Sequence, residues 1–567
     1  MHKRIIILSA IIFIVFLSLL NYGAYAEDTS TSSSISTQND ITGDNSVYVS
    51  GVKNGKITCN DKDWEVLLNA KCKIENGRVV CPKDINPKFY ENYNASIGGT
   101  STSNSTVGTT QPSSNTSTST NSSPFNLFLS RSHKSAETSA SSLASITPSW
   151  FPQVVGAQIE SINQWMPSFH NDYQGPQSLS HYTYGKADSQ VYAINLGSQL
   201  TKNLQAYTDI AWFKGSGISG GMGAGGYVNG DMVRAGSSNL PEDIYIARAY
   251  LKYSHPFLSE GKTETVDRGP DQLAVSQSIN RIEMKIGELA AADDFDLNRY
   301  ANNSTNQFFN YDFMFNTAWD YAADTRGYSY GIVSSINQEK WRWATGVYMM
   351  PDTANGAHFD FTDVRELGYN TELTLKPNKA GTVVRLLSYL NEGRMGNYNE
   401  AISLAQSSGT TPSLLNVEKE GNTKFGFGLN FEQPLLDNGE TGLFGRLGWN
   451  NGKTETWCYT EADRNASIGA QISGIHWNRK DDHIGIAYGL NGLSQAHRTY
   501  LSDGGTGILL GDGSLNYGLE NVMEIYYRIQ LGSYIQITPD FQLIANPGYN
   551  SDRGPAEVFG IRLNLHV

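Results

Sequence analysis

Glycines at 215, 217 and 220 have the spacing of a dinucleotide-binding turn. That turn needs a helix directly after it, whose N-terminus receives the pyrophosphate. Here more glycines follow instead, among them Gly221 and Gly223, and no Lys-Ser or Lys-Thr pair completes a phosphate loop. We therefore expect a mobile or inward-folded loop in this region and no cofactor.

Three carboxylates lie close together at Asp293, Asp294 and Asp296. They could offer calcium the hard oxygen ligands that it prefers, but an acidic solvated turn explains them as well, and we favour that interpretation. A glycosidase would need a carboxyl pair at a defined separation, and a serine hydrolase a Gly-x-Ser-x-Gly turn. Neither pattern stands out, so the sequence predicts no metal site, no catalytic residue and no enzyme.

The chain has four cysteines. Cys59, Cys72 and Cys81 lie close together without the spacing of a zinc site. In an exported chain one disulfide among them is expected, its pairing left open and one thiol left over. Cys458 stands apart from the others. We expect it to be a lone thiol or, as the less favoured alternative, a partner for the leftover cysteine.

The elements that would position polar side chains are amphipathic β-strands of about ten residues. In residues 522–531, Ile525 belongs to an apolar face, and Glu524, Tyr526 and Arg528 to the opposite, polar face. A period of two with one apolar face is the signature of a half-buried strand. The same alternation recurs in residues 281–287, 425–432, 535–543 and 559–567.

These strands are long enough to cross a bilayer, and their polar faces suit a water-filled lumen. The chain length fits sixteen to eighteen strands, since eight would leave overlong connections and twenty-two would leave no room for a plug. The sequence thus predicts an all-β fold, a transmembrane antiparallel β-barrel of about 16 strands. The net charge of −13 leaves no basic footprint for nucleic acid.

The N-terminal part has a different character. Lys3 and Arg4 precede an apolar run that ends at Ala24-Tyr25-Ala26, as in a cleaved export signal. Tracts rich in Ser, Thr and Asn cannot bury enough apolar surface to fold. The expected organisation is a signal peptide at 1–26, a disordered tract at 27–46, a small Cys-containing module at 47–97, a Ser/Thr/Asn-rich linker at 98–149 and the barrel at 150–567.

Several blocks in the barrel region carry a family resemblance. They include Phe541-Gln542-Leu543-Ile544-Ala545-Asn546-Pro547, Asp552-Arg553-Gly554-Pro555, and Trp319-Asp320-Tyr321 with Asp324-Thr325-Arg326-Gly327-Tyr328. Residues 151–567 resemble the carbohydrate-selective outer-membrane porins of the OprB type, which implies a barrel of about sixteen strands and sugar uptake. Two features depart from that family. Residues 27–147 match nothing in it, and the chain ends in His566-Val567 rather than an aromatic residue.

Together these observations predict a passive, sugar-selective channel in the outer membrane of a Gram-negative cell. Its partners would be small sugars, outer-membrane lipid, the barrel-assembly machinery and, through a periplasmic N-terminal module, the cell wall. The alternatives are a general or cation-preferring porin, an outer-membrane enzyme acting on lipid or polysaccharide, and a soluble carbohydrate-binding protein. The residues expected to line the lumen and contact sugar are Arg248, Lys252, Glu283, Lys285, Arg385, Arg446, Glu524, Tyr526, Arg528 and Arg562.

Overall fold

The computed structural model describes most of residues 148–567 and four short strands nearer the N-terminus. The described ranges are 51–53, 56–58, 73–75, 78–80, 148, 150–180, 185–231, 242–257, 262–362, 365–458 and 460–567. The predicted signal peptide, disordered tract, linker and cysteine pairing therefore lie outside the described residues. Within the predicted module, β1 (Gly51–Lys53) pairs with β2 (Lys56–Thr58), and β3 (Lys73–Glu75) with β4 (Arg78–Val80).

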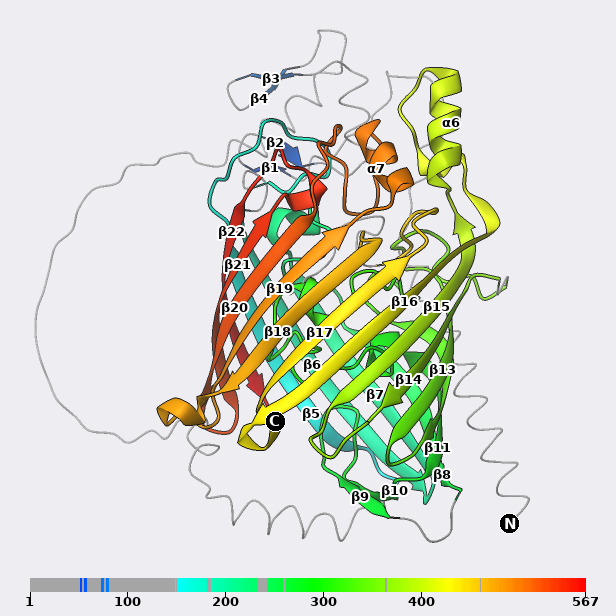
Figure 1. Ribbon diagram of the computed structural model, residues 1–567, viewed down its shortest axis with the longest axis vertical. Coiled ribbons are helices and arrows are strands. Elements are labelled where there is room, and N and C mark those ends of the chain that lie inside the picture. The colour runs from blue at the N-terminus through cyan, green and yellow to red at the C-terminus, as the bar shows by residue number, and fades with distance from the viewer. Residues whose placement is uncertain are drawn as a thin grey trace, which may run out of the picture. The chain divides into compact units, whose positions relative to one another are not determined.

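Sixteen antiparallel strands close into a barrel, which confirms the predicted fold (Figure 1). Each strand pairs with the next strand of the barrel, and β22 pairs with β5 to close the ring. The strands are β5 (Gln153–Trp165), β6 (Lys186–Thr201), β7 (Leu204–Gly215), β8 (Tyr245–Pro256), β11 (Arg281–Leu289), β12 (Ser329–Asn337), β13 (Trp341–Met349), β14 (Leu367–Leu375), β15 (Val383–Met395), β16 (Lys419–Leu436), β17 (Thr441–Asn450), β18 (Arg464–Ser473), β19 (His483–Gly492), β20 (Glu520–Leu531), β21 (Ile535–Ala545) and β22 (Ala556–His566).

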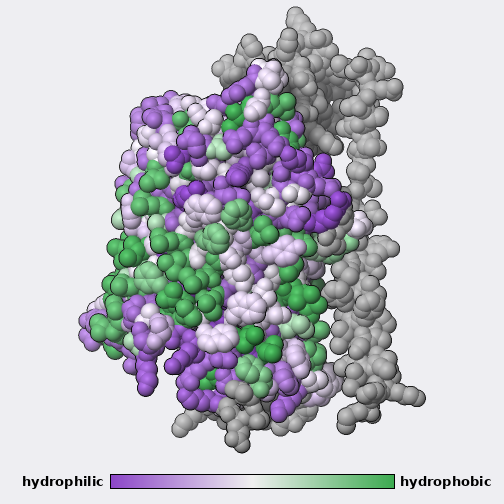
Figure 2. Space-filling view, turned by 45° about the vertical axis from the view of Figure 1, so that its right-hand side comes forward, coloured by the Kyte–Doolittle hydropathy of each residue, from purple (hydrophilic) through white to green (hydrophobic). Residues whose placement is uncertain are grey.

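The predicted alternation sets the two faces of the wall. On β20, Ile525 is 40% exposed on the outside, whereas Glu524 is wholly buried on the inside. Other exposed outer residues are equally apolar, among them Phe427, Leu447 and Ile468. In Figure 2, hydrophobic residues gather across the middle of the face shown, with hydrophilic residues above and below them. Such an apolar band matches the hydrocarbon core of a bilayer.

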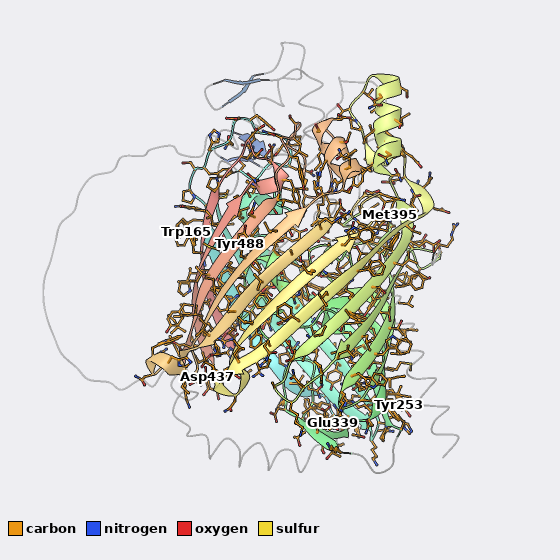
Figure 3. The ribbon with its side chains drawn as sticks, viewed as in Figure 1. Trp165, Tyr253, Glu339, Met395, Asp437 and Tyr488 are labelled. Atoms are coloured by element: carbon orange, nitrogen blue, oxygen red, sulfur yellow. The ribbon has the colours of Figure 1, made fainter. Side chains whose placement is uncertain are left out.

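The two rims of the barrel differ in their connections. On what we call the long-loop rim, the segments 166–185, 216–244, 290–328, 350–366, 396–418, 451–463, 493–519 and 546–555 join the strands. The opposite, short-turn rim has tight turns such as 202–203 and 338–340, and one longer connection, 257–280. Figure 3 places Met395 at the upper, long-loop rim, and Tyr253 and Glu339 at the lower rim.

Short helices lie within the connections between the strands. They are α5 (Tyr311–Met314), α6 (Tyr398–Ser408), α7 (Gln495–Ser502), η2 (Ile218–Gly221), η3 (Ala291–Asp293), η4 (Leu414–Asn416), η5 (Asp437–Gly439), η6 (Gly474–Trp477) and η7 (Pro547–Tyr549). The connection 257–280 holds a hairpin of β9 (Thr263–Val266) and β10 (Val275–Ser278). Within the described ranges, no helix combines the length and apolarity needed to span a membrane.

Two long loops fold back into the barrel. The glycine-rich segment around η2 is buried, so it is the inward-folded loop that the sequence analysis allowed for. Loop 290–328 lies deeper, with Phe308, Phe309 and Phe313 fully buried. A hydrophobic cluster inside the barrel joins Phe308 and Phe313 to the wall residues Phe444 and Tyr526. The lumen is thus partly filled, and the inserted loops determine where it stays open.

Candidate functional site

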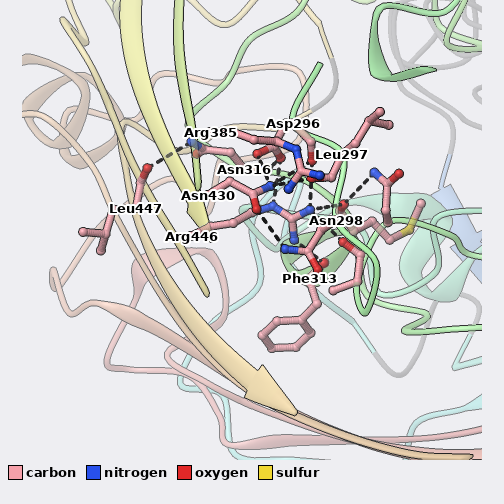
Figure 4. Close-up of polar contacts among 12 residues, drawn as sticks. Asp296, Leu297, Asn298, Phe313, Asn316, Arg385, Asn430, Arg446 and Leu447 are labelled. Carbon is pink, nitrogen blue, oxygen red and sulfur yellow. Dashed lines mark hydrogen bonds and ion pairs between the residues drawn. The ribbon is translucent and has the colours of Figure 1, made fainter. Parts of the chain in front are cut away.

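Arg446 on β17 anchors the inserted loop 290–328 to the wall (Figure 4). Its Nε donates to Asp296 Oδ2 at 2.8 Å, and its terminal nitrogens donate to the carbonyls of Ala301 at 2.7 Å and Phe313 at 2.8 Å. The Asn316 side chain also occupies the space in front of Gly448 on the same strand, where a Cβ would collide with it. One buried guanidinium therefore fixes both the start and the middle of the loop.

Two further predicted residues hold the same loop. Glu524 on β20 accepts from the backbone N–H groups of Phe309 at 2.6 Å and Asn310 at 2.9 Å. Arg562 on β22 donates to the carbonyls of Ser304 and Gln307, the latter at 2.9 Å. These contacts satisfy loop backbone groups that would otherwise lie buried without partners.

Tyr526 and Arg528 also face inward on β20 and meet the loop. The Tyr526 ring packs edge-on against Phe308, with 5.0 Å between ring centroids. Arg528 donates to the Asn306 carbonyl at 3.2 Å. Four candidates point toward the barrel interior, the direction that the alternation along their strands predicts, but each is at most 1% exposed. They are Arg446, Glu524, Tyr526 and Arg562. Their burial does not fit the expected direct contact with a passing sugar, because loop 290–328 covers them.

Four other candidates form ion pairs and stay partly exposed. Lys252 Nζ lies 3.4 Å from Glu283 Oε1, and Arg385 lies 3.4 Å from Glu432. Lys285 pairs with Asp294 at 3.0 Å. The four candidate side chains keep 11–19% exposure, and their partners Glu432 and Asp294 keep 9% and 7%. They form paired charges along a partly hydrated wall.

The carboxylates at 293, 294 and 296 are not a solvated turn, which corrects the favoured interpretation. Asp293 binds Arg248, Asp294 binds Lys285 and Arg342, and Asp296 binds Arg446. Asp294 and Asp296 are 5% and 1% exposed. Among the residues that the structure describes, no group of histidine, cysteine or carboxylate side chains could hold a metal. The three acids instead bind the loop to basic residues of the wall.

Four arginines of the wall share one row of the sheet. The strand register links Arg281 to Arg342 through Asn337, Arg342 to Arg385 through Thr374, and Arg385 to Arg446 through Asn430. The arginines stand on alternate strands, so a polar residue separates each from the next. Two members of the row pair with loop carboxylates, Arg342 with Asp294 and Arg446 with Asp296. Arg281 and Arg385 pair with Glu264 and Glu432 instead.

A cavity of about 260 Å³ remains between loop 290–328 and the wall. It is slightly smaller than the roughly 300–1,000 Å³ of pockets for drug-sized ligands, which fits a small solute. Its lining mixes aromatic and polar side chains, including Phe213, Tyr245, Arg248, Asp293, Tyr311, Tyr321, Arg326 and Tyr328. We call it the channel cavity.

Arg248 is the predicted residue that lines this cavity. It donates to Asp293 at 2.6 and 2.8 Å and to Asp209 at 3.1 Å, and its guanidinium lies 5.2 Å from the Tyr328 ring centroid. Sequence reasoning missed Arg326, whose guanidinium lies 4.5 Å from the Tyr245 ring centroid. Arg326 stands inside one of the blocks that carry the family resemblance, so that block was the available signal.

A second hollow, of about 630 Å³, lies on the outside of the wall. Ile159, Ile194, Ile210 and Trp212 line it on β5–β7. It belongs to the apolar outer band, so hydrocarbon rather than a hydrophilic solute suits it.

The connections of the long-loop rim pack around a buried histidine. His497 on α7 stacks on Tyr398 of α6 at 4.4 Å and lies 3.1 Å from Asp463 and 3.7 Å from Glu461. Burial would lower the pKa of His497, but the hydrogen bond and charge of Asp463 outweigh it and leave this pKa raised. Burial would raise the pKa of Asp463, yet His497 holds it well below its usual range.

Cys458 lies in the same group of connections. It is a free, buried cysteine whose Sγ donates to the Ala323 carbonyl at 2.9 Å. Burial raises the pKa of its thiol, which opposes formation of a reactive thiolate. It is the lone thiol that the sequence analysis favoured.

Comparisons with known proteins agree with this architecture. Residues 263–566, more than half of the chain, match the model of the carbohydrate-selective porin, OprB family. The high-pH structure of Pseudomonas putida OprB superposes with a TM-score of 0.57 over 76% of this chain and 97% of that one, at 13% identity, which shows a shared fold. Porin AaxA of Chlamydia pneumoniae is 44% identical over 48 residues, a match that spans 8% of this chain and 11% of that porin.

Proposed function

Because this chain belongs to the OprB family of carbohydrate-selective porins, we propose that it is a passive outer-membrane channel for small sugars. In such barrels the short turns face the periplasm and the longer loops face outward. Solutes would therefore enter at the long-loop rim, pass the channel cavity and leave at the short-turn rim. Diffusion down a gradient needs no catalytic group.

The channel cavity carries this proposal. Its arginine and carboxylate side chains can exchange hydrogen bonds with sugar hydroxyls as water leaves them. Its tyrosines add apolar ring surface for the carbon side of a sugar ring, although arginines lie over one face of Tyr245 and of Tyr328. Each contact is weak alone, which suits a channel, since a solute must leave as readily as it enters.

We further propose three roles for the predicted residues and Arg326. Arg446, Glu524, Tyr526 and Arg562 shape the passage by holding loop 290–328, whereas Arg248 and Arg326 contact solute. Lys252, Glu283, Lys285, Arg385 and Arg528 contribute the electrostatic field along the path. The remaining partners follow from an outer-membrane barrel: lipid around the wall and the assembly machinery during insertion. A periplasmic N-terminal module would reach the cell wall.

Single-channel recording in planar bilayers with a panel of sugars tests the function. We expect concentration-dependent block of the ion current by some mono- or disaccharides, and weaker block by uncharged polyols of similar size. Equal passage of sugars, amino acids and polyols, set by size alone, would favour a general porin instead. Chemical conversion of a sugar or lipid by the purified protein would contradict the channel function and favour an enzyme.

A further inference from the structure

The connection 257–280 is the longest on the short-turn rim and carries the β9–β10 hairpin (Figure 1). At its tip, Gly269 and Gln272 exchange two backbone hydrogen bonds of 3.0 Å each. Between them, Asp271 has a φ of +54°, as the third residue of a tight turn requires. The tip is therefore a defined turn that presents Asp271.

The tip packs against the inner wall. The backbone N–H of Leu273 donates to Tyr207 Oη at 3.1 Å, and the Leu273 side chain is only 6% exposed. It lies over Gly197, where an ideal Cβ would come within 3.1 Å of Leu273 Cγ. Gly197 and Tyr207 face each other on β6 and β7, a few residues above the short-turn rim. The hairpin thus enters the mouth of the barrel.

Asp271 then meets Arg248 at 3.6 Å, the same arginine that binds Asp293 of loop 290–328. Two segments inserted from opposite rims therefore meet at one guanidinium. Arg248 lines the channel cavity, so the hairpin tip lies directly behind that cavity on the way to the short-turn rim. The Asp271 side chain stays 21% exposed, which leaves it accessible to water in the lumen.

We propose that the β9–β10 hairpin forms a second constriction at the periplasmic exit, with residue 271 lining the passage. Loop 290–328 would select solutes at the cavity, and the hairpin would limit the size and charge of what leaves it. Leu273 positions the tip against the wall, and Asp271 faces the path. This proposal needs ions to cross the barrel but needs no sugar binding.

Cysteine modification tests whether residue 271 lines the path. Asp271→Cys places a thiol on the turn, and Asp267→Cys, the matched control, places one between β9 and the turn. Residue 267 is exposed, whereas residue 271 faces Arg248. Each purified channel would be treated in a planar bilayer with a cationic and an anionic methanethiosulfonate, and mass spectrometry would report the extent of labelling. Treated wild-type channels set the baseline for the chain's own cysteines.

We expect labelling of Asp271→Cys to reduce conductance by about half or more, because added bulk in a narrow passage blocks ions directly. The two reagents should shift ion selectivity in opposite directions. Labelled Asp267→Cys should stay within about a fifth of its unlabelled conductance. Full labelling at 271 without loss of current, equal effects at 267, or failure of 271 to react while 267 reacts would each overturn the proposal.

A second variant tests the anchor. Leu273→Ala should loosen the tip and raise conductance and current noise, whereas Val275→Ala on β10 should not. Heat-modifiable migration in SDS gels would show that both barrels are closed. Unchanged conductance of Leu273→Ala in a closed barrel would contradict the anchoring role. A channel that conducts but shows no sugar block would refute the proposed function and leave both tests of the hairpin valid.

Discussion

Arg446 Nε lies 2.8 Å from Asp296 Oδ2, and neither side chain is more than 2% exposed. The pair joins the wall of the barrel to the loop that narrows it. Around the same guanidinium, four backbone carbonyls of loop residues accept hydrogen bonds. The shape of the channel therefore depends on a buried ion pair whose partners are far apart in the sequence.

Arg446→Met should loosen this loop. It leaves Asp296 as an unpaired buried carboxylate, and breaking a buried pair in this way costs about 3–5 kcal/mol. We expect a lower unfolding temperature, noisier current and weaker discrimination among sugars. Arg365→Met is the matched control, because its ion pair with Glu420 is exposed and worth about 0–1 kcal/mol. Similar losses in both variants would contradict the anchoring role of Arg446.

Ile525→Arg should impair assembly, because an arginine on the lipid-facing side costs about 2–4 kcal/mol near the middle of the bilayer. Leu404→Arg on α6 is a matched control: Leu404 is 43% exposed and Ile525 40%, but α6 belongs to a connection at the rim. The measurement is the fraction of heat-modifiable barrel recovered from outer membranes. Equal recovery of both variants would contradict the lipid-facing assignment of Ile525.

Arg326→Gln should weaken sugar block without closing the channel. Loss of a charged donor to a hydroxyl removes about 1 kcal/mol, so the half-blocking concentration should rise roughly fivefold. Arg394→Gln is the control, because the Arg394 side chain is exposed at the long-loop rim. This variant should leave the half-blocking sugar concentration unchanged. Sugar titrations of single-channel current measure both. If sugar blocks the Arg326→Gln channel as strongly as the wild type, Arg326 does not lie on the solute path.

The His497–Asp463 pair predicts a pH window for the packing of loop 493–519. The raised pKa of His497 gives stability that is complete below its unfolded value near 6.5 and is lost as pH rises through the folded pKa. The lowered pKa of Asp463 gives stability that is present above about 3.9 and is lost as pH falls through the folded pKa. Protection of the loop should thus peak between about pH 4 and pH 6.5.

Hydrogen exchange of loop 493–519, measured from below about pH 4 to above about pH 6.5, would show where protection of the loop is greatest. His497→Gln should flatten the pH profile, because the imidazolium is the group that titrates at its upper end. His476→Gln is the control, since His476 pairs with Asp437 at 3.0 Å at the opposite, short-turn rim. A profile that is flat in the wild type would contradict the pair's contribution.

The strands were predictable because their signal is local. On β20, neighbouring residues such as Glu524 and Ile525 must point to opposite faces whatever surrounds them. The family resemblance then agreed with the strand number. The alternation along β17 and β22 puts Arg446 and Arg562 on the face that contacts loop 290–328.

What covers a lumen residue is not a local property. Arg446 binds loop carbonyls more than a hundred positions away in the sequence. The periodicity of a strand does not predict such a partner. The same reason hid the packing of Asp296 and the placement of Arg326 and Asp271. Each depends on how a connection of irregular structure folds back into the barrel, which follows from the finished tertiary contacts.

The seam between β5 and β22 has a consequence for assembly. These strands pair from Phe559 with Trp165 to His566 with Gln158, although they stand at opposite ends of the barrel sequence. Until they meet, each presents a row of unpaired backbone groups, and hydrocarbon offers such groups no hydrogen bonds. An open sheet with two unpaired edges is therefore unstable in the bilayer. The first and last strands must pair while the sheet inserts, not afterwards.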